Sequence, residues 1–419
     1  MKIAVVGGGS TYTPELVDGV ARLGLPVAEL ALIDPAADRL EIVGGFAARL
    51  FDHHGHPGRV TWTADPAVGL ADADAVLIQL RVGGQTARTS DETFPLACGC
   101  VGQETTGAGG LAKALRTVPV VLEIADLARR FARPGAWIID FTNPVGIVTR
   151  ALLDAGHRAV GLCNVAIGTQ RWVAEAFGVT PEEVELDHVG LNHLTWDRAV
   201  RVAGVDRLPE MLSGDLDRLA GGLGFPPEVL TTVQAIPSYY LRYYYHHDEV
   251  VDAERGRPTR GETVAEVERE LLRLYADPAV TTKPELLGKR GGAFYSEAAV
   301  GLLRSLHGEP GVHSVNVRND GTLPFLPDEA VVEVTAPVTE KGPAPAPAGW
   351  LEPAIRGLVA HVSAYEELAL DAALRGGRDR VYRALLAHPL VGQHAIADGL
   401  TDRLLAANAA HLPWLRDRA

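Results

Sequence analysis

A cysteine and a histidine on two separate segments are the first residues whose types suggest a metal site. Cys163 follows the aliphatic segment 160–162, and His193 closes the segment Gly-Leu-Asn-His at 190–193. A thiolate and an imidazole can hold a divalent cation while leaving coordination positions for substrate oxygens. Such residues are more often a core thiol and a hydrogen-bonded histidine, so both interpretations stay open at this point.

An aromatic run at 238–245, Ser-Tyr-Tyr-Leu-Arg-Tyr-Tyr-Tyr, is the second feature that could do chemistry. We expect it on a helix over 239–247, where tyrosines three or four positions apart share one face and pack with their hydroxyls at the rim. A nearby cation could instead lower the pKa of one phenol and make it a proton-abstracting base. Composition alone does not choose between packing and catalysis.

A glycine-rich segment at 7–12, Gly-Gly-Gly-Ser-Thr-Tyr, follows the first aliphatic run and precedes a predicted helix over 14–23. Such a turn lets the backbone approach a pyrophosphate, and the helix N-terminus adds free N–H groups and a positive dipole. Tyr12 replaces the third glycine of the usual fingerprint, and the alternative is a turn that serves packing alone. An acid after the second strand suits the ribose hydroxyls of NAD. The predicted cofactor-binding residues are Gly7, Gly9, Ser10, Thr11 and Asp34.

These candidates need a sheet to position them, and residues 1–165 predict one. Aliphatic runs without polar alternation occur at 3–6, 30–33, 75–80, 137–141 and 160–162, with helical patterns between them. Strands of this kind are covered on both faces, so we predict an α/β fold with a Rossmann-like, doubly wound parallel sheet. Cys163 then lies at the carboxyl edge, where open α/β sheets bind ligands.

Residues 166–419 predict a second, mixed α+β domain with a helical C-terminus. We expect strands within 184–202, 312–317 and 331–334, helices at 239–247 and 262–275, and long apolar helices after residue 350. A proline-rich stretch at 343–347 predicts an exposed connector before the last helices. The chain thus divides into a dinucleotide-binding domain, 1–165, and a domain that carries metal and substrate, 166–419.

The overall composition narrows the classes of function. The 419 residues are 47% hydrophobic and 22% charged, with a net charge of −14 at pH 7. This acidic balance argues against a nucleic-acid partner, because phosphate binding needs a basic face. The first apolar run is too short for a signal peptide or a membrane span. Three cysteines cannot form a paired framework, so we expect the reducing cytoplasm and no membrane partner.

Several motifs, in order along nearly the whole chain, resemble glycoside hydrolase family 4, whose members use NAD and a divalent metal to cleave glycosides. Asn164 resembles the 6-phospho-β-glucosidases of this family, since the α-glucosidase relatives generally carry Asp after the cysteine. Ala166 departs from the pattern, because relatives commonly have proline there. The matching motifs are residues 7–13, 81–84, 102–107, 142–144, 163–165, 190–194, 240–244 and 289–292.

The resemblance implies roles for individual residues. Cys163 and His193 match the Mn²⁺ ligands, and Tyr240 matches the tyrosine that abstracts a proton. Arginines at substrate-contacting positions suit a sugar phosphate, because a guanidinium matches phosphate oxygens in geometry and charge. Their alternative role is ordinary surface charge. The implied substrate-binding residues are Arg88, Asn143, Asn164 and Arg260.

The resemblance also implies an activity, the hydrolysis of phosphorylated β-glucosides such as cellobiose 6-phosphate. In the implied cycle NAD⁺ oxidises C3 of the sugar, Tyr240 removes the proton on C2, the aglycone is eliminated, water adds, and C3 is reduced again. NAD-dependent glycosidases of this family are a known exception to hydrolysis by two carboxylic acids. The family commonly forms dimers or tetramers, so we expect a homodimer or homotetramer.

Two alternatives stay open. A family-4 enzyme of another specificity would act on an unphosphorylated, α-linked or uronate glycoside, because a guanidinium also matches a carboxylate. A malate- or lactate-type NAD-dependent dehydrogenase would share the Rossmann domain and accumulate NADH. That second alternative leaves Cys163, His193 and Tyr240 without a role.

Overall fold

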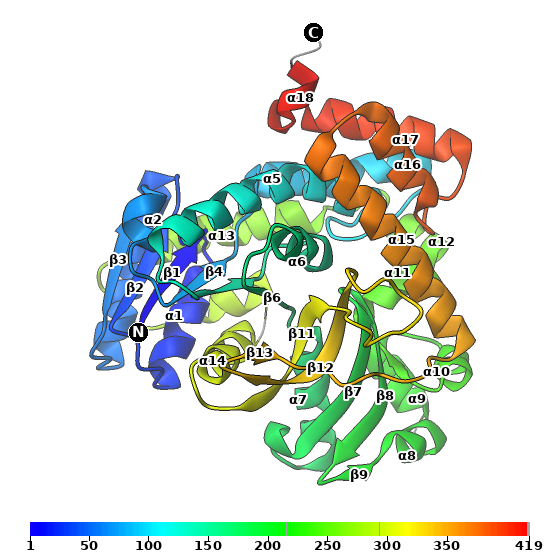
Figure 1. Cartoon of the computed structure of the whole chain (residues 1–419), viewed down its shortest axis with the longest axis horizontal. Coiled ribbons are helices and arrows are strands. Elements are labelled where there is room, and N and C mark those ends of the chain that lie inside the picture. Colours follow the sequence, from blue (N-terminus) through cyan, green and yellow to red (C-terminus); the bar gives the residue numbers. More distant parts are fainter. Residues whose placement is uncertain (215, 293, 417–419) are drawn as a thin grey trace.

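A mixed β-sheet runs through the centre of the molecule (Figure 1). The computed structural model describes residues 1–214, 216–292 and 294–416. At one end of the sheet, parallel strands follow the order β3-β2-β1-β4-β5-β6, the order of a doubly wound dinucleotide-binding fold. These strands are β1 Lys2–Val6, β2 Glu29–Ile33, β3 Arg59–Thr63, β4 Ala75–Ile78, β5 Trp137–Asp140 and β6 Ala159–Leu162.

Antiparallel strands extend this sheet beyond β6 without a break. β11 pairs with β6, and β12, β7, β8 and β10 follow in that order, while β13 and β9 pair with β12 and β8. The predicted fold class is confirmed, whereas the domain division at residue 165 stays a prediction. The bounds are β7 Val184–Leu191, β8 Leu194–Val202, β9 Val205–Asp206, β10 Ile236–Pro237, β11 Gly311–Arg318, β12 Val331–Thr339 and β13 Gly342–Pro343.

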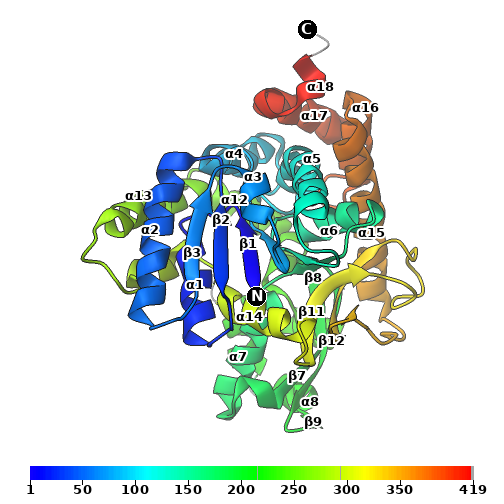
Figure 2. The same cartoon turned by 60° about the vertical axis from the view of Figure 1, so that its left-hand side comes forward.

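Helices cover both faces of the parallel strands (Figure 2). α1 packs against α2 on one face, and α5 packs against α6 on the other. Helix α1 buries Leu16, Val17 and Val20, the spacing of one helical face turned to the sheet. The helices of this half are α1 Thr13–Arg22, α2 Ala37–His53, α3 Pro66–Leu70, α4 Gly84–Thr93, η1 Phe94–Cys98, α5 Gly107–Phe131 and α6 Val145–Asp154.

The remaining helices surround the antiparallel strands and form the C-terminal region. Helix α15 packs along α5 and α6, and α16 to α18 stand beyond it at the top right of Figure 1. Residues 344–352 have neither helix nor strand, which agrees with the predicted connector. These helices are α7 Val165–Phe177, η2 Pro181–Glu183, α8 Leu208–Ser213, α9 Leu216–Leu223, α10 Pro227–Val233, η3 Tyr239–Leu241, α11 Arg242–Tyr245, α12 His247–Glu254, α13 Arg260–Ala276, η4 Glu285–Arg290, α14 Tyr295–Leu306, α15 Pro353–Arg375, α16 Arg378–Ala387, α17 His394–Asn408, η5 Ala409–His411 and α18 Pro413–Arg416.

Two sequence predictions about elements were wrong. The single helix expected over 239–247 is instead a 3₁₀ turn followed by α11 and α12, with a break at His246, whose φ of −135° and ψ of 40° are not helical. Strand β3 was missed because its sequence, Arg-Val-Thr-Trp-Thr, lacks an aliphatic run. It lies at the outer edge of the sheet and is only partly buried, so polar residues are tolerated there.

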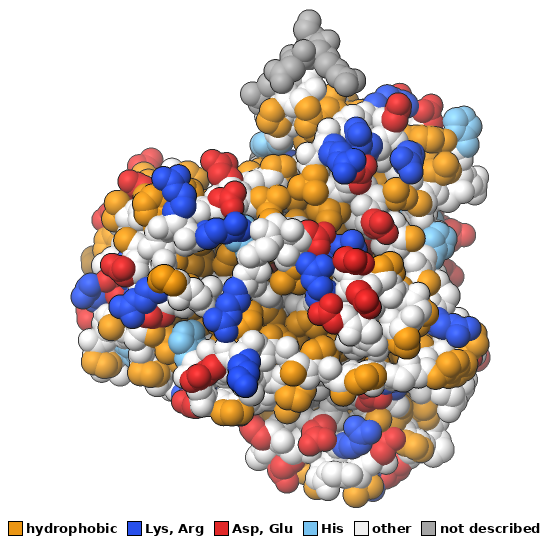
Figure 3. Space-filling view, viewed as in Figure 1, with side chains coloured by type: hydrophobic (Ala, Val, Ile, Leu, Met, Phe, Trp, Pro, Cys, Tyr) orange, Lys and Arg blue, Asp and Glu red, His pale blue; other side chains and the backbone are white. Residues whose placement is uncertain are grey.

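Charged side chains of both signs are mixed over the face seen in Figure 3, and no broad basic area occurs on it. Among the described residues, no helix combines the length and the apolar character that crossing a membrane requires.

Two adjacent glycines in α2 offer a matched test of the packing. A methyl group added at Gly44 would lie 2.5 Å from Cδ2 of Trp62, whereas one at Gly45 would approach nothing closer than Arg49 Nη1 at 3.9 Å. We expect Gly44→Ala to lower stability by about 1–3 kcal/mol through overpacking. Gly45→Ala should raise stability by about 0.5–1 kcal/mol, because alanine favours the helix. Urea unfolding followed by circular dichroism measures both, and equal shifts would contradict this packing.

Candidate active site

The candidate site lies at the carboxyl end of β6, where the sheet changes from parallel to antiparallel. The register places Gly161 of β6, Asn316 of β11 and Glu333 of β12 in one row across the sheet. Cys163 comes directly after the end of β6, and β7, which pairs with β12, leads into the turn that carries His193. Pairing between distant strands therefore brings the two predicted metal ligands to the same edge.

Cys163 is buried and surrounded by hydrogen-bond donors. The backbone N–H groups of Asn164 and Val165 and the side-chain amide of Asn192 are near enough to act to lower the pKa of its thiol. Helix α7 begins at Val165, and a helix N-terminus favours a thiolate. Burial and the nearby charge of Glu333 nevertheless raise the pKa of the thiol above its usual value. A bound cation would reverse this balance, because a coordinated thiol loses its proton.

His193 occupies the turn between β7 and β8 with a left-handed φ of +61°. Its Nδ1 lies 3.0 Å from the hydroxyl of Thr105, which leaves Nε2 as the atom available to a metal. Burial lowers the pKa of His193 to about 4. The imidazole is therefore neutral near pH 7, which is the form that binds metals.

Tyr240 lies directly on His193. The two rings are parallel within 6° and their centroids are 3.6 Å apart. Burial, together with the neighbouring Cys163, raises the pKa of Tyr240 well above its ordinary value, while the positive charge of Arg88 acts in the opposite direction. The structure thus brings Tyr240 together with both predicted ligands and with one predicted substrate-binding arginine.

A buried acid behind this site was missed by the sequence analysis. One oxygen of Glu333 accepts hydrogen bonds from Asn192 and Asn316, both at 2.9 Å, and the other lies 3.1 Å from Nε2 of His188. The opposite nitrogen of His188 lies 2.7 Å from Asp197. Although burial alone would lower the pKa of His188, the two carboxylates raise it to about 10. Since Asn192 also acts on the pKa of Cys163, this network lies directly behind the candidate ligands.

The missed acid has a recognisable signal in the sequence. Glu333 interrupts the strand Val-Val-Glu-Val at 331–334, where a buried position would ordinarily be apolar. A charged side chain at such a position must be paired or functional. Its partners, however, lie on other strands, so the sequence alone could not identify them.

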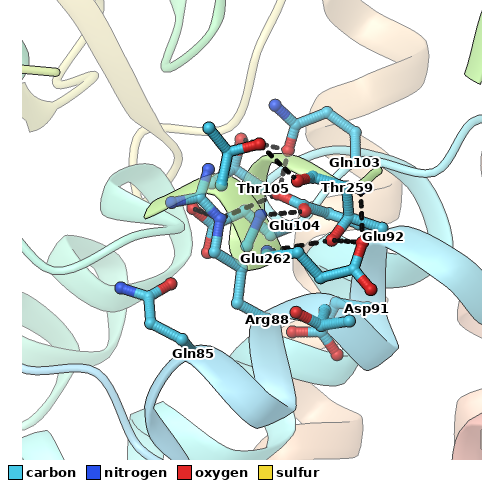
Figure 4. Close-up of polar contacts among 12 residues, drawn as sticks. Gln85, Arg88, Asp91, Glu92, Gln103, Glu104, Thr105, Thr259 and Glu262 are labelled. Atoms are coloured by element: carbon cyan, nitrogen blue, oxygen red, sulfur yellow. Dashed lines mark hydrogen bonds and ion pairs between the residues drawn. The ribbon is translucent and has the colours of Figure 1, made fainter. Parts of the chain in front are cut away.

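A second buried acid, Glu104, pairs with three basic side chains beside the site, and Figure 4 shows it next to one of them, Arg88. Lys113 Nζ lies 2.7 Å from one of its oxygens, Arg88 Nε lies 3.3 Å from the other, and Arg81 also pairs with it. Although burial acts to raise the pKa of Glu104, these three cations hold it well below its ordinary value. Because Arg88 also pairs with Glu92 and burial lowers the pKa of Lys113 to about 7, the charges of this cluster nearly balance.

The two predicted phosphate-binding arginines are connected through Glu92. Its carboxylate accepts from Arg88 Nε at 2.8 Å and from the backbone N–H of Gly261 at 2.7 Å, one residue after Arg260 at the start of α13. Arg260 is exposed and donates to the carbonyl of Lys289 at 2.8 Å. Arg88 has two carboxylate partners, whereas Arg260 forms no ion pair within the described residues.

The two predicted asparagines also lie near the carboxyl edge. Asn143 follows β5, and its side-chain Oδ1 is buried without a hydrogen-bond partner among the described residues. A buried acceptor of this kind fits a ligand hydroxyl. Asn164 is the N-cap residue of α7, directly after Cys163. Their roles in substrate binding stay predictions.

The glycine-rich loop between β1 and α1 is packed tightly against its neighbours. A methyl group at Gly7 would lie 2.6 Å from the carbonyl of Gln79, and one at Gly9 would lie 2.8 Å from Cγ of Asp34. Asp34 also accepts from the N–H of Gly9 at 3.1 Å. The acid is thus held beside the loop at the end of β2, the position that suits a dinucleotide ribose.

A buried acid on α13 fixes the other side of this loop. Glu268 accepts from the hydroxyl of Thr11 at 3.1 Å and pairs with Arg39 and Arg290. Arg39 in turn donates to the carbonyl of Gly9 at 2.7 Å. Ser10, the remaining predicted cofactor residue, accepts from the N–H of Tyr12. The loop is therefore ordered by its own protein contacts, and its binding role stays a prediction.

The donor set fits an open metal site. Within residues 1–214, 216–292 and 294–416, no group of three or more His, Cys, Asp or Glu side chains is arranged to hold a metal ion. Cys163 and His193 would therefore supply two ligands and leave the other positions to substrate and water. A thiolate with a neutral imidazole suits a divalent transition metal.

Comparison with protein-family models identifies the family to which the chain belongs. The description "Family 4 glycosyl hydrolase" matches residues 2–179, and "Family 4 glycosyl hydrolase C-terminal domain" matches residues 188–391. The chain belongs to glycosyl hydrolase family 4. The family that the sequence motifs resemble is thus confirmed.

Individual family members are similar over their full length. A protein of Bacillus subtilis (strain 168) named "Probable 6-phospho-beta-glucosidase" is 40% identical, with 99% of this chain and 97% of that protein covered. A 6-phospho-β-glucosidase of Escherichia coli (strain K12) is 34% identical, with 100% and 97% covered. The Thermotoga maritima 6-phospho-β-glucosidase, solved with manganese, NAD⁺ and glucose 6-phosphate, has a TM-score of 0.90 at 34% identity, with 98% of this chain and 99% of that chain covered.

The acid behind the site can be tested with a nearly isosteric change. In Glu333→Gln an NH₂ group replaces one carboxylate oxygen. The new group is a hydrogen-bond donor, so it cannot accept from Asn192 and Asn316, or, in the other orientation, from charged His188. We expect about 3–5 kcal/mol lower stability, the cost of breaking a buried charged pair. We also expect about tenfold to hundredfold weaker binding of a divalent metal, because the support of the ligands is lost. Urea unfolding and calorimetric titration with Mn²⁺ measure the two effects.

The matched control is Glu329→Gln, a change at an exposed acid shortly before β12. It should alter neither quantity. If Glu333→Gln lowered stability but kept the Mn²⁺ affinity of the unchanged protein, Glu333 would serve the fold and not the metal site.

Proposed function

We propose that this chain is a 6-phospho-β-glucosidase that depends on NAD⁺ and a divalent metal, Mn²⁺. The observation that carries the proposal is the stacking of Tyr240 on His193 beside Cys163, at the carboxyl edge of a Rossmann sheet. The Escherichia coli relative is named a 6-phospho-β-glucosidase, and the Thermotoga maritima 6-phospho-β-glucosidase was solved with both cofactors. An ordinary dehydrogenase would not require this cluster.

Each group in the site has a task in such a reaction. When bound, NAD⁺ supplies a hydride acceptor, and a divalent cation supplies positive charge that polarises sugar oxygens. Cys163 and His193 would hold the cation, the first as a thiolate and the second through Nε2. Tyr240 Oη would take the proton from C2 of the sugar. Burial raises the pKa of Tyr240 well above its ordinary value, and the charge of Arg88 acts against this rise.

The sugar phosphate would lie near the start of α13. Arg260 is exposed and keeps a charge that no carboxylate of the described residues neutralises. A guanidinium fork binds phosphate oxygens in pairs. The free thiols of Cys98, Cys100 and Cys163 suit the cytoplasm, where phosphorylated sugars would be met in a reducing environment. Assembly into a homodimer or homotetramer is part of the proposal.

Tyr240→Phe tests the proposed base. Release of p-nitrophenol from its β-glucoside 6-phosphate should need both NAD⁺ and Mn²⁺ and should leave no accumulated NADH. The variant lacks only the phenol oxygen, so we expect turnover to fall by about 10²- to 10⁴-fold, the usual contribution of a positioned base. Binding of NAD⁺ and Mn²⁺, measured by calorimetry, should be unchanged.

The same assay with the unphosphorylated and α-linked substrates separates the alternatives. Turnover of either one in place of the phosphorylated β-glucoside would keep the family and reject this substrate. Net NADH production would favour a dehydrogenase. Substantial activity of Tyr240→Phe would remove Tyr240 from the role of base.

Arg260→Ala tests recognition of the phosphate. Loss of a charge-assisted contact should raise KM for the phosphorylated substrate by about tenfold to hundredfold, because hydrogen bonds to charged groups contribute about 1.5–3 kcal/mol. Arg257→Ala removes an exposed arginine three residues earlier, which has no ion pair within the described residues, and should leave KM unchanged. Similar KM values for the two variants would assign the phosphate to other residues.

A further inference from the structure

Tyr239, the residue before the proposed base, is left open to solvent. It is 53% exposed, whereas Tyr243 in the same run is 3% exposed. The 3₁₀ turn that carries it is fixed at its start, because the N–H of Ser238 donates to the carbonyl of Thr195 in β8 at 2.9 Å. An aromatic ring at this place is not needed to fill the core.

The ring of Tyr239 is nevertheless held by its neighbours. The guanidinium of Arg242 lies 4.1 Å from its ring centre and 4.8 Å from that of Tyr243. Arg242 also donates to the hydroxyl of Tyr243 at 3.1 Å, and Gln103 donates to the same hydroxyl at 3.3 Å. The edge of Tyr239 meets Tyr240 at 80°, with 5.9 Å between the ring centres.

This arrangement fixes the orientation of an exposed ring before any ligand arrives. Little conformational entropy is lost when a ligand packs on a side chain that is already held. The ring carries no charge, so it suits a neutral ring and not the phosphorylated end of the substrate. Arg260, which forms no ion pair within the described residues, is available for the phosphate. Its edge contact with Tyr240, the proposed base, would place it beside the reacting sugar.

We propose that Tyr239, held by Arg242, is the platform on which the aglycone of the substrate packs. The ligand class is a neutral sugar or aryl ring attached through the glycosidic oxygen, bound through apolar C–H or aromatic faces. This inference rests on the proposed function and extends it from the phosphorylated sugar to the group that leaves. Tyr239 is a specificity-determining residue in this role, since it contacts the aglycone and not the reacting carbon atoms.

Three substrates that differ only in the aglycone test the proposal: cellobiose 6-phosphate, p-nitrophenyl β-glucoside 6-phosphate and methyl β-glucoside 6-phosphate. Aromatic packing is worth about threefold to tenfold in affinity. Tyr239→Ala should therefore raise KM by that factor for the first two substrates. It should change KM by less than twofold for the methyl glucoside and for inhibition by glucose 6-phosphate, which lack a ring in this position. Tyr239→Phe should retain the affinity, because the ring is kept.

Trp350→Ala is the matched control. Trp350 is 66% exposed and has Arg356 5.8 Å from its ring centre, so it resembles Tyr239 in exposure and in its cation, but it belongs to no part of the site. It should leave all KM values unchanged. An active enzyme in which Tyr239→Ala changes no KM, or raises KM equally for all substrates and for glucose 6-phosphate, would overturn the platform alone. A wild-type protein that cleaves none of the three would overturn the proposed function, and the platform with it.

Discussion

The pairing of β11 with β6 is the constraint on which the site depends. It continues one row of the sheet from Gly161 through Asn316 to Glu333. A methyl group at Gly161 would lie 2.8 Å from Cβ of Asn316, so the absence of a side chain there allows the row to form. Because side chains alternate between faces, a shift of one residue would turn Glu333 away from Asn192 and remove the support behind Cys163.

The dinucleotide loop depends on a similar contact between distant parts of the chain. Glu268 of α13 pairs with Arg39 and Arg290 and bonds to Thr11 in the loop. The hydroxyl of Tyr275, on the same helix, donates to the carbonyl of Thr11 at 2.9 Å. Helix α13 also starts at Arg260, so one rigid element connects the loop with the proposed phosphate site. The fold thereby sets the distance between the predicted dinucleotide loop and the proposed phosphate site.

What the sequence could predict follows from the range of the interactions. Aliphatic runs identified five of the six parallel strands, all except the edge strand β3, because a strand buried on both faces needs no partner to be recognised. The loop residues and the pair Cys163 and His193 stood at strand ends, where chemistry is expected. Glu333 and His188 could not be assigned, since their meaning arises from pairing between β7, β8 and β12. The helix over 239–247 was misjudged because its period was clear while the break at His246 carries no sequence signal such as Gly or Pro.

The aromatic run contains residues that fit each of the two interpretations, packing and catalysis. Tyr243 is buried and serves packing, and its hydroxyl orders Arg242 and Gln103. Tyr240 lies one turn earlier and is stacked on His193, a contact that packing alone would not require to be parallel. The buried tyrosines therefore fix the backbone of the run, and this rigidity is what allows the ring of Tyr240 to be held at one distance from the candidate ligands. Packing is the means by which the proposed base is positioned.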